Sequence, residues 1–318
     1  MSHLFVRLPN HLGDACMALP ALDLLAARGF ELTLVGRAWA RSLFEAYRWP
    51  VVTPSGGLLA RIGALRTADH AVEADTRGLL FTNSFSTALE FRLARLRSTG
   101  YATDARGWLL ADAVQLPNHA ANARVADLHM VDYYFRLAER LAGTAPVPDD
   151  LNLRLSERAS VQARKLCTDA GVEPGNVMLC PVAVGLHRGR VKAWQGFGRL
   201  SADLAARGVC VVACPGPGEH AEVRAALPMA IVLPSTDVGT FAALLAASRL
   251  VVANDSGPGH LAAAVGTPLV SVFGVTEPAR TRPWGRQVRV VGGTVHGAEP
   301  GWPSYEDVAG AVNAALSN

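Results

Sequence analysis

The chain has 318 residues, of which 50% are hydrophobic and 18% are charged, so it can bury a large core, and its length favours two domains over one. This composition excludes an intrinsically disordered chain. The formal net charge of +3 does not favour a nucleic-acid-binding protein, although it is compatible with a local basic face for a phosphorylated partner.

The amino-terminal segment MSHLFVRLPN lacks the charged, apolar and small-residue regions of a secretory signal. The richest apolar stretch, residues 241–254, is interrupted by Arg249, so we expect no membrane span. The cysteines are scattered and include no CxxC pair, which is typical of reduced core thiols in a cytoplasmic protein and does not favour a metal site. They are Cys16, Cys167, Cys180, Cys210 and Cys214.

Runs of β-branched and apolar residues alternate with Ala- and Leu-rich helical segments, and this alternation predicts an α/β fold with parallel sheets. In the first half we expect strands at 3–8, 31–36 and 78–83, and a weaker one at 70–74. The expected helices are 14–28, 38–47, 57–66 and 85–96, followed by one that begins near Leu128.

Residues 142–153 are rich in Pro, Gly and Asp and are typical of an interdomain linker, which predicts domains at 1–150 and 151–318. The second half repeats the pattern, with a helix at 156–170 and strands at 177–184, 209–214, 230–235, 250–255, 269–274 and 288–293. A closing helix at 304–316, with Ser304 as its N-cap, can pack back on the first domain. We therefore expect two doubly wound sheets that face each other across a cleft at the carboxyl ends of their strands.

The segment 251–274 predicts a phosphate site, because a buried strand runs into small and polar residues that begin a helix. Amides at a helix N-terminus and the helix dipole favour an anion, glycines such as Gly259 allow close approach of the backbone, and His260 can donate to the same phosphates. The alternative is an ordinary helix start that has Asp255 or Ser256 as its cap. The candidate residues at the turn are Asn254, Asp255, Ser256 and Gly257.

A second strand-to-helix turn lies in VRLPNHLGDACMALPAL, residues 6–22. Asp14 is the candidate general base, and Gly13 lets the loop pass close to a ligand. A carboxylate at this position can equally cap the helix.

The segment 187–208 is a basic loop followed by an amphipathic helix, and it carries Arg188, Arg190 and Lys192. Positive charge here would stabilise a departing diphosphate, with Lys192 positioned by the neighbouring Trp194; the alternative is a solvated surface loop. In segment 213–227, Glu219 is the candidate partner of ribose hydroxyls, although it and Glu222 can also be solvent-facing helix residues.

Segment 81–110 is the candidate rim for an anionic acceptor, because Asn83 and Ser84 end a strand and several arginines follow. Arg92 and Arg95 can share one helical face, where a solvated stripe is the alternative. We interpret three histidines without carboxylate or histidine partners at ligand spacing as structural residues: His70, His119 and His129.

Taken together, these motifs resemble glycosyltransferase family 9, the ADP-heptose heptosyltransferases of lipopolysaccharide inner-core assembly. Residues 7–22 are similar to the family's segment of an arginine, a Gly-Asp pair and an LPAL-like run, and 254–268 match its NDSG-x-x-H-x-A-A-A-x-G-x-P signature. Residues 273–285 resemble FGPTDPxRxxPxG, with Val275 and Glu277 as departures, and the usual K-x-W-P reads KAWQ at 192–195. Segments 83–89, 98–114 and 129–134 look most like the heptosyltransferase II subfamily.

The resemblance implies a GT-B fold and a metal-independent, inverting transfer that needs no cofactor. The donor would be ADP-L-glycero-β-D-manno-heptose, and the acceptor a lipid-anchored lipopolysaccharide core at the inner face of the inner membrane, with peripheral membrane contact. By the same resemblance Asp14 removes the acceptor proton, Lys192 stabilises the ADP leaving group and Glu219 holds the ribose. The diphosphate would be surrounded by Asp255, Ser256, Gly257 and His260.

Three other functions stay open from the sequence. The first is a transferase of the same fold that acts on a protein or another glycan, which the missing proline of the KAWQ loop keeps open. The second is a GT-B-like sugar-nucleotide epimerase, which would turn the nucleotide over without an acceptor. The third is a binding protein without catalysis, against which the presence of both Asp14 and Lys192 argues.

Overall fold

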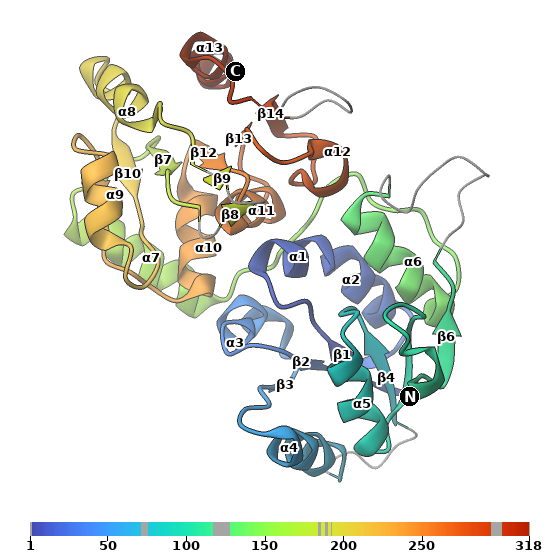
Figure 1. The fold of residues 1–318 in the computed structure, drawn as a ribbon. Helices are drawn as coiled ribbons and strands as arrows, with labels where there is room; N and C mark the ends of the chain where they lie inside the picture. The colour runs from blue at the N-terminus through green and yellow to red at the C-terminus, as the bar shows by residue number, and fades with distance from the viewer. Residues whose placement is uncertain are drawn as a thin grey trace. The chain divides into compact units, whose positions relative to one another are not determined.

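The computed structural model describes residues 2–70, 76–116, 128–183, 186–187, 190–191, 193–293 and 301–317. The chain forms two compact units, Met1–Pro148 and Asp149–Asn318, and the division falls inside the Pro- and Asp-rich segment 142–153. Each unit has its own sheet and its own helices (Figure 1).

Unit 1 contains a six-stranded parallel sheet with the order β3-β2-β1-β4-β5-β6. Its central strand β1 pairs with β2 on one side and β4 on the other, so that Val6 lies between Leu34 and Leu79. Four of the five β1 residues are buried, as expected of a strand covered on both faces. The strands are β1 (His3–Arg7), β2 (Glu31–Val35), β3 (Val51–Val52), β4 (Thr76–Leu80), β5 (Arg97–Tyr101) and β6 (Asp112–Val114).

Helices cover both faces of this sheet. Those of one face, α4 (Leu58–His70) and α5 (Phe85–Leu93), bury Leu65, Ala88 and Phe91 against strand residues such as Phe5 and Leu80. On the other face lie α1 (Leu12–Met17), α2 (Leu19–Ala27) and α6 (Met130–Ala142), with α2 packed on α6 (Figure 1). The remaining short helices are α3 (Ala40–Leu43), η1 (Glu45–Tyr47) and η2 (Gly107–Leu109).

The sequence predictions for unit 1 differ from the structure in detail. The single helix expected at 14–28 is two helices that meet at Ala18, and Pro20 stands in the first turn of α2, where a missing N–H costs least. The helix expected at 38–47 is likewise broken into α3 and η1. The weak strand expected at 70–74 is not a strand at His70, which ends α4, and its other residues lie outside the described part of the chain. The short strands β3 and β6, and β5 with its polar sequence RSTGY, went unpredicted.

Unit 2 repeats the topology of unit 1. Its six strands are parallel and follow the order β11-β10-β7-β12-β13-β14, in which the first strand along the chain again lies in the middle. They are β7 (Val177–Cys180), β10 (Val211–Ala213), β11 (Ile231–Val232), β12 (Leu250–Asn254), β13 (Leu269–Phe273) and β14 (Val288–Gly292). A small antiparallel pair, β8 (Leu186–His187) with β9 (Arg190–Val191), precedes α8.

The helices of unit 2 are α7 (Glu157–Asp169), α8 (Phe197–Ala206), α9 (His220–Ala226), α10 (Val238–Ala247), α11 (Gly257–Ala264), α12 (Pro278–Thr281) and α13 (Tyr305–Ser317). The last helix, α13, buries Val308, Ala311 and Val312 in the core of unit 2, together with strand residues such as Val252 and Val272. Ser304 and Asp307 bond to each other at its start, the capping pair that the sequence predicts.

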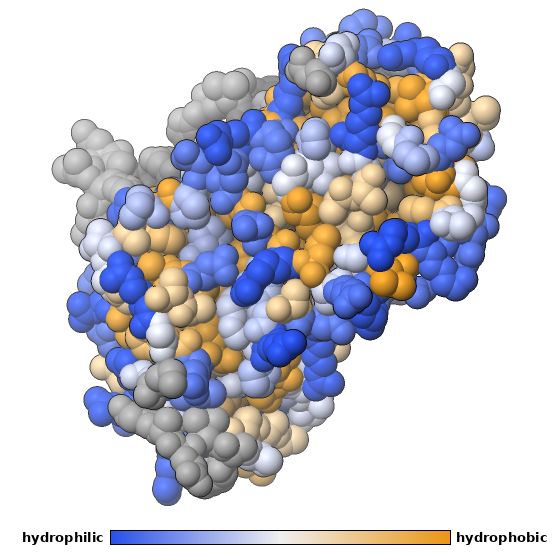
Figure 2. Space-filling view, turned by 180° about the vertical axis from the view of Figure 1, so that it is seen from behind, coloured by the Kyte–Doolittle hydropathy of each residue, from blue (hydrophilic) through white to orange (hydrophobic). Residues whose placement is uncertain are grey.

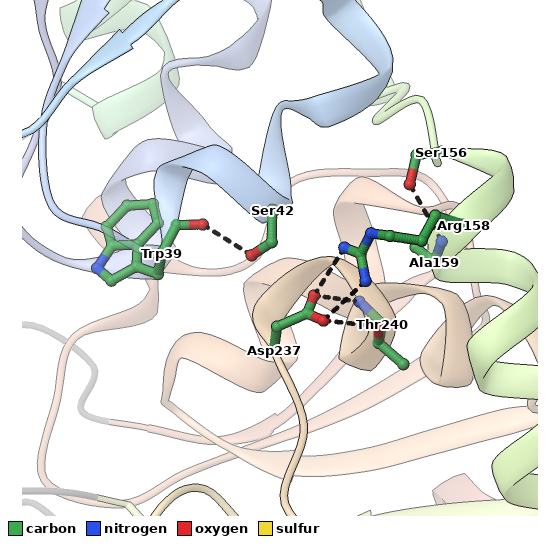
Figure 3. A network of polar contacts seen from close by, with 7 residues as sticks. All are labelled: Trp39, Ser42, Ser156, Arg158, Ala159, Asp237 and Thr240. Carbon is green, nitrogen blue, oxygen red and sulfur yellow. Dashed lines mark hydrogen bonds and ion pairs between the residues drawn. The ribbon is translucent and has the colours of Figure 1, made fainter.

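Two helices of unit 2 are tied together at their N-terminal ends. Asp237 caps α10 through Thr240, and its carboxylate also binds both terminal nitrogens of Arg158 on α7 (Figure 3). Ser156 caps α7 by accepting from the Ala159 amide at 3.1 Å. These caps satisfy backbone N–H groups that a helix leaves unpaired in its first turn.

The surface carries both kinds of side chain. Hydrophobic and hydrophilic residues are intermixed over the face that Figure 2 shows. No helix in the described part of the chain combines the length and the apolar character that crossing a bilayer requires.

Candidate active site

The strand order of both sheets contains the same kind of topological switch point. In unit 1 the chain leaves β1 toward β2 and leaves β4 toward β5, so the loops after β1 and β4 run in opposite directions at the carboxyl edge. In unit 2 the corresponding pair is β7 and β12. Ligands of doubly wound folds bind at such a point. Asp14 begins the helix that follows β1, Asn83 follows β4 and Asp255 follows β12, whereas Lys192 comes after β7 in the sequence.

Asp14 lies in the first turn of α1, directly after the loop that follows β1. Its side chain is half-buried, Gly13 beside it is buried, and the Tyr134 hydroxyl of α6 donates a hydrogen bond to its Oδ1 atom at 3.3 Å. His11 occupies the N-cap position and makes no capping bond with its side chain. The carboxylate of Asp14 thus bonds to a tyrosine of another helix, and the structure shows no capping role for it among the described residues.

Arg7, the last residue of β1, shapes the loop that precedes Asp14. Its guanidinium donates to the carbonyls of Leu8 and Val35, at 3.2 and 3.1 Å, and to the side-chain oxygen of Asn10 at 3.0 Å. Burial lowers the pKa of Arg7, an effect that Glu90 opposes and nearby arginines reinforce. Arg7 therefore holds in place the loop that leads from β1 to Gly13 and Asp14.

Asn83 and Ser84 follow β4 at the same edge of the sheet, and both are occupied by internal contacts. Asn83 exchanges hydrogen bonds with the Tyr133 hydroxyl at 2.7 and 2.9 Å, and its Oδ1 also accepts from Arg106 at 3.2 Å. Ser84 is the N-cap of α5, where its hydroxyl accepts from the Thr87 amide. These contacts shape the carboxyl edge of the sheet. They do not by themselves indicate that an acceptor substrate binds there.

The two arginines proposed for the same rim lie elsewhere. Arg92 stands in the last turn of α5, and Arg95 follows that helix with a left-handed φ of 70°. Both are exposed and lead into the start of β5. Because all six strands are parallel, strand starts lie at the edge opposite to the carboxyl ends. The structure therefore does not bring Arg92 and Arg95 together with Asn83, Ser84 and Asp14.

The phosphate-site candidate of unit 2 is the turn from β12 into α11. Ser256 is the N-cap residue of α11, but its hydroxyl donates back to the Asn254 carbonyl at 3.2 Å and makes no capping bond. Ser256 and Gly257 are half-exposed, whereas Asp255 and His260 are buried. The accessible part of this helix start is thus Ser256 and Gly257, and an anion there would meet the positive end of the helix dipole.

Asn254 points inward. It is fully buried, its amide nitrogen donates to the Pro181 carbonyl at 2.6 Å, and its oxygen accepts from the Trp194 amide at 3.0 Å. Both ends of the side chain are thus used inside the protein. Asn254 holds together the loop after β7 and the segment that follows Lys192, which is a different role from direct contact with a donor.

Gly259 is buried in α11 beside β12. A Cβ atom at this residue would lie 3.5 Å from the Asn254 carbonyl and 3.6 Å from the Ala253 and Pro283 side chains. These are ordinary van der Waals distances, so the packing around Gly259 does not by itself require a glycine.

Glu219 occupies the N-cap position of α9 and folds back on its own loop. Its Oε2 atom accepts from the Gly216 amide at 2.9 Å, and its own amide donates to the Gly216 carbonyl at 3.1 Å. Glu219 is half-buried, whereas Glu222 is exposed on the helix. One carboxylate oxygen of Glu219 thus holds the turn that follows β10.

Lys192 and Arg188 lie outside the described residues. The segment immediately after them is well packed: the Trp194 indole donates to the Pro303 carbonyl at 3.2 Å and stacks on Tyr305, with ring centroids 6.1 Å apart and planes 8° from parallel. Only glycine fits at Gly196, where a Cβ would lie 2.2 Å from the Trp194 ring.

The histidine and cysteine side chains do not form a metal centre in the described part of the chain, where no three His, Cys, Asp or Glu residues gather as metal ligands do. His129 caps α6 by accepting from the Val131 amide at 3.2 Å, a structural role as predicted, and His119 and the side chain of His70 are not described. Burial raises the pKa of the Cys16 and Cys214 thiols to about 12, so both stay protonated.

The sequence of this chain matches a known family. The family model for glycosyltransferase family 9 (heptosyltransferase) matches residues 66–301. The chain belongs to glycosyltransferase family 9. This glycosyltransferase is 27% identical to lipopolysaccharide heptosyltransferase 2 of Salmonella typhimurium, in an alignment that covers 89% of this chain and 86% of the relative.

Solved structures agree with the fold. The glycosyltransferase superposes on ADP-heptose lipopolysaccharide heptosyltransferase II of E. coli with a TM-score of 0.78 and 25% identity, covering 99% of this chain and 98% of the other. It superposes on E. coli heptosyltransferase WaaC, solved with ADP, with a TM-score of 0.72 and 18% identity, covering 100% and 99% of the two chains. The GT-B expectation is therefore confirmed, with a doubly wound sheet in each unit.

The contributions of Tyr133, Tyr134 and Arg106 to this site were not predicted from the sequence. The two tyrosines stand in an amphipathic helix, where aromatic residues usually pack in the core, so no local signal marks them as neighbours of Asp14 and Asn83. Arg106 carries a charge and would be expected at the surface, yet it is fully buried.

Proposed function

We propose that this glycosyltransferase transfers heptose from ADP-L-glycero-β-D-manno-heptose to the lipopolysaccharide inner core, with inversion at the anomeric carbon. The names of its relatives, lipopolysaccharide heptosyltransferases 2 and 3, support the reaction class and the acceptor class. The same relatives do not favour the epimerase or another acceptor. Because the proposed acceptor is anchored in lipid, the enzyme would act at the cytoplasmic face of the inner membrane, in peripheral contact with the lipid.

The observation that carries the proposal is the position of Asp14. Its half-buried carboxylate stands at the topological switch point of unit 1, in the first turn of a helix, and the Tyr134 hydroxyl binds one of its oxygens. A carboxylate held in this way suits a general base. Asp14 would take the proton of the acceptor hydroxyl, whose oxygen then forms the new bond to the anomeric carbon while the bond to ADP breaks.

Unit 2 is proposed to hold the donor. The amides at the start of α11, with Ser256 and Gly257 accessible and Asp255 and His260 buried beside them, would receive the diphosphate. Lys192 and Arg188 would stabilise the negative charge that grows on ADP as it leaves. Glu219 is proposed to bind the ribose with the carboxylate oxygen opposite to the one that binds Gly216.

Unit 1 is proposed to bind the acceptor. Asn83 would act indirectly, because both ends of its side chain bond to Tyr133 and Arg106. Ser84 would do the same as the cap of α5. Arg92 and Arg95 lie at the opposite edge of the sheet, so an acceptor that reaches them would extend well away from Asp14.

The deciding experiment measures ADP release from purified protein given ADP-heptose and no added metal, with lipid A that carries Kdo alone or Kdo and one heptose. ADP release that depends on one of these lipids, together with a heptosylated product, is the expected result. Epimerised sugar nucleotide without ADP release would contradict the proposal. So would donor binding without turnover on either lipid, which would direct the search to another acceptor.

A further inference from the structure

The side chain of Tyr134 connects α6 to α1 through the hydroxyl that donates to Asp14 at 3.3 Å. We propose that Tyr134 is the positioning residue for the catalytic base: it binds Oδ1 of Asp14 so that Oδ2 faces the acceptor hydroxyl. The inference rests on the proposed function, in which Asp14 is the base. The contact is longer than an ideal O–H···O bond, as catalytic hydrogen bonds commonly are before substrate binds.

The ring of Tyr134 is held on two sides. It is 4% exposed and packs edge-on against Phe81, at 5.2 Å between ring centroids and an interplanar angle of 64°. Against Tyr133 the centroids are 5.5 Å apart and the angle is 84°. Edge-to-face packing of this kind stabilises a ring in one orientation. The hydroxyl of Tyr134 is therefore delivered to a fixed place.

The helix turn that carries Tyr134 is itself anchored by its neighbour. The hydroxyl of Tyr133 exchanges hydrogen bonds with Asn83, and the backbone carbonyl of Tyr133 accepts from the Tyr101 hydroxyl at 2.8 Å. Asn83 is in turn bound by Arg106, which also donates to the carbonyls of Tyr101, Thr82 and Ser84. The start of α6 is thus attached to β5 and to the loop after β4.

The chemistry of the pair suits a base. A neutral phenol donates its proton to a carboxylate without giving it up, because the pKa values of the two groups differ widely. Donation stabilises the ionised carboxylate, which is the form that accepts a proton from the acceptor. It also holds the carboxylate in one rotamer, so that the second oxygen keeps one direction.

The described elements packed on α1 carry several titratable groups besides Asp14. Cys16 of α1 itself is buried and protonated, because burial and then Asp14 raise its thiol pKa to about 12. The helix α6 contributes Tyr134, with Tyr133, Asp132 and Arg136 beside it, and α2 contributes Asp23. Of these groups, Tyr134 makes the hydrogen bond to the carboxylate.

The test compares Tyr134→Phe with the matched control Tyr133→Phe. Both changes remove one hydroxyl from adjacent tyrosines of one helix and keep the ring, but only the first removes the donor to Asp14. In Tyr134→Phe we expect kcat to fall about tenfold, KM for the donor to stay unchanged, and the acid limb of the kcat profile to move up by about one pH unit. Tyr133→Phe keeps the donor to Asp14, both ring contacts of Tyr134 and the Tyr101 bond to the Tyr133 carbonyl, so we expect its acid limb to move less than that of Tyr134→Phe.

A second measurement needs no substrate. The Asp14 carboxyl carbon, assigned in ¹³C NMR spectra by its loss in Asp14→Asn, is observed at pH 7 in the wild type and in both tyrosine variants. A carboxyl chemical shift that moves more in Tyr134→Phe than in Tyr133→Phe supports the inference. A chemical shift that is unchanged in Tyr134→Phe, or an unchanged kcat and acid limb, overturns it while the proposed transfer stands. Full transfer by Asp14→Asn would instead overturn the role of Asp14 as the base, and the positioning role with it.

Discussion

The side-chain oxygen of Asn254, at the end of β12, accepts a hydrogen bond from the backbone amide of Trp194 at 3.0 Å. The same side chain donates to the Pro181 carbonyl just after β7. One buried amide at the end of β12 therefore binds both the start of the loop after β7 and the segment that follows Lys192 in the sequence. Asn254, the asparagine of the NDSG segment, thus stabilises the candidate donor site through internal hydrogen bonds.

Replacing Asn254 with alanine should destabilise unit 2. The change leaves a buried N–H of Trp194 and a buried carbonyl of Pro181 without partners, and each costs about 1–3 kcal/mol in the free energy of unfolding. Urea denaturation measures the effect. The matched control is Asn313→Ala, because Asn313 is exposed and bonds to Arg207 at the surface, so it should change stability by less than about 0.5 kcal/mol. Equal effects of the two changes would contradict the internal role of Asn254.

Asp14→Asn should abolish transfer and leave ADP affinity nearly unchanged. The base acts on the acceptor, whereas the nucleotide is proposed to bind at α11 in unit 2. Asparagine keeps the size and the hydrogen-bond acceptor of the side chain but cannot take a proton, and loss of general base catalysis costs about 10²–10⁴-fold in kcat. ADP affinity is measured by calorimetry and transfer by ADP release. A variant that loses ADP affinity as well would show that the assignment of the two roles is wrong.

Arg106→Met should be among the most destabilising changes in unit 1. Arg106 is fully buried and donates to three backbone carbonyls and to Asn83, so one substitution removes a donor from four acceptors at once. Burial lowers the pKa of Arg106, an effect that Tyr133 and Asp104 oppose, so the folded protein bears a cost for holding this cation inside. We expect a loss of about 3–5 kcal/mol in the free energy of unfolding.

Arg106→Lys should fail to restore this stability, since an ammonium cannot reproduce the planar set of donors that reaches several acceptors at once. The control is Arg92→Met, at an exposed position of the same unit. Chemical denaturation of the three variants gives the comparison. Stability of Arg106→Lys equal to that of the wild type would show that charge alone is what the site requires.

Asp237 should make part of the stability of unit 2 dependent on pH. Burial raises the pKa of this carboxyl, but hydrogen bonds from Arg158 and Thr240 outweigh burial, so the pKa lies below its ordinary value (Figure 3). A carboxyl whose pKa is lower in the folded than in the unfolded state stabilises the fold at pH values above its unfolded pKa of about 3.9. This stabilisation is lost as the pH falls through the folded-state pKa.

Asp237→Asn isolates the charge, because asparagine is also a good N-cap. The pair with Arg158 is more than a third exposed, so the wild type should exceed this variant by only about 0.5–1 kcal/mol at pH 7. Urea denaturation at pH 7 and near pH 2.5 should show this difference shrinking toward zero in acid. A difference that is independent of pH would exclude the charge as its source.

The sequence by itself determined the local features of this protein. Apolar runs such as 3–8 and 250–255 are strands because such residues suit a sheet that is buried on both faces, and the Gly-Asp and Asn-Asp-Ser-Gly turns follow strands because small and polar residues begin helices. These signals need only a few neighbouring residues. They were enough to predict the α/β fold and the family resemblance.

Only the tertiary structure decided which residues meet. Tyr134 and Asp14 are 120 residues apart in the sequence, and their contact depends on α6 packing against α1. The parallel sheet also places the two ends of α5 at opposite edges, which separates Arg92 from Asn83 although a short stretch of sequence joins them. Whether a polar side chain faces a ligand or the interior, as Asn254 does, is set by the loops that fold over it. Its hydrogen-bond partners Pro181 and Trp194 lie in loops far from it in the sequence, which sequence spacing does not record.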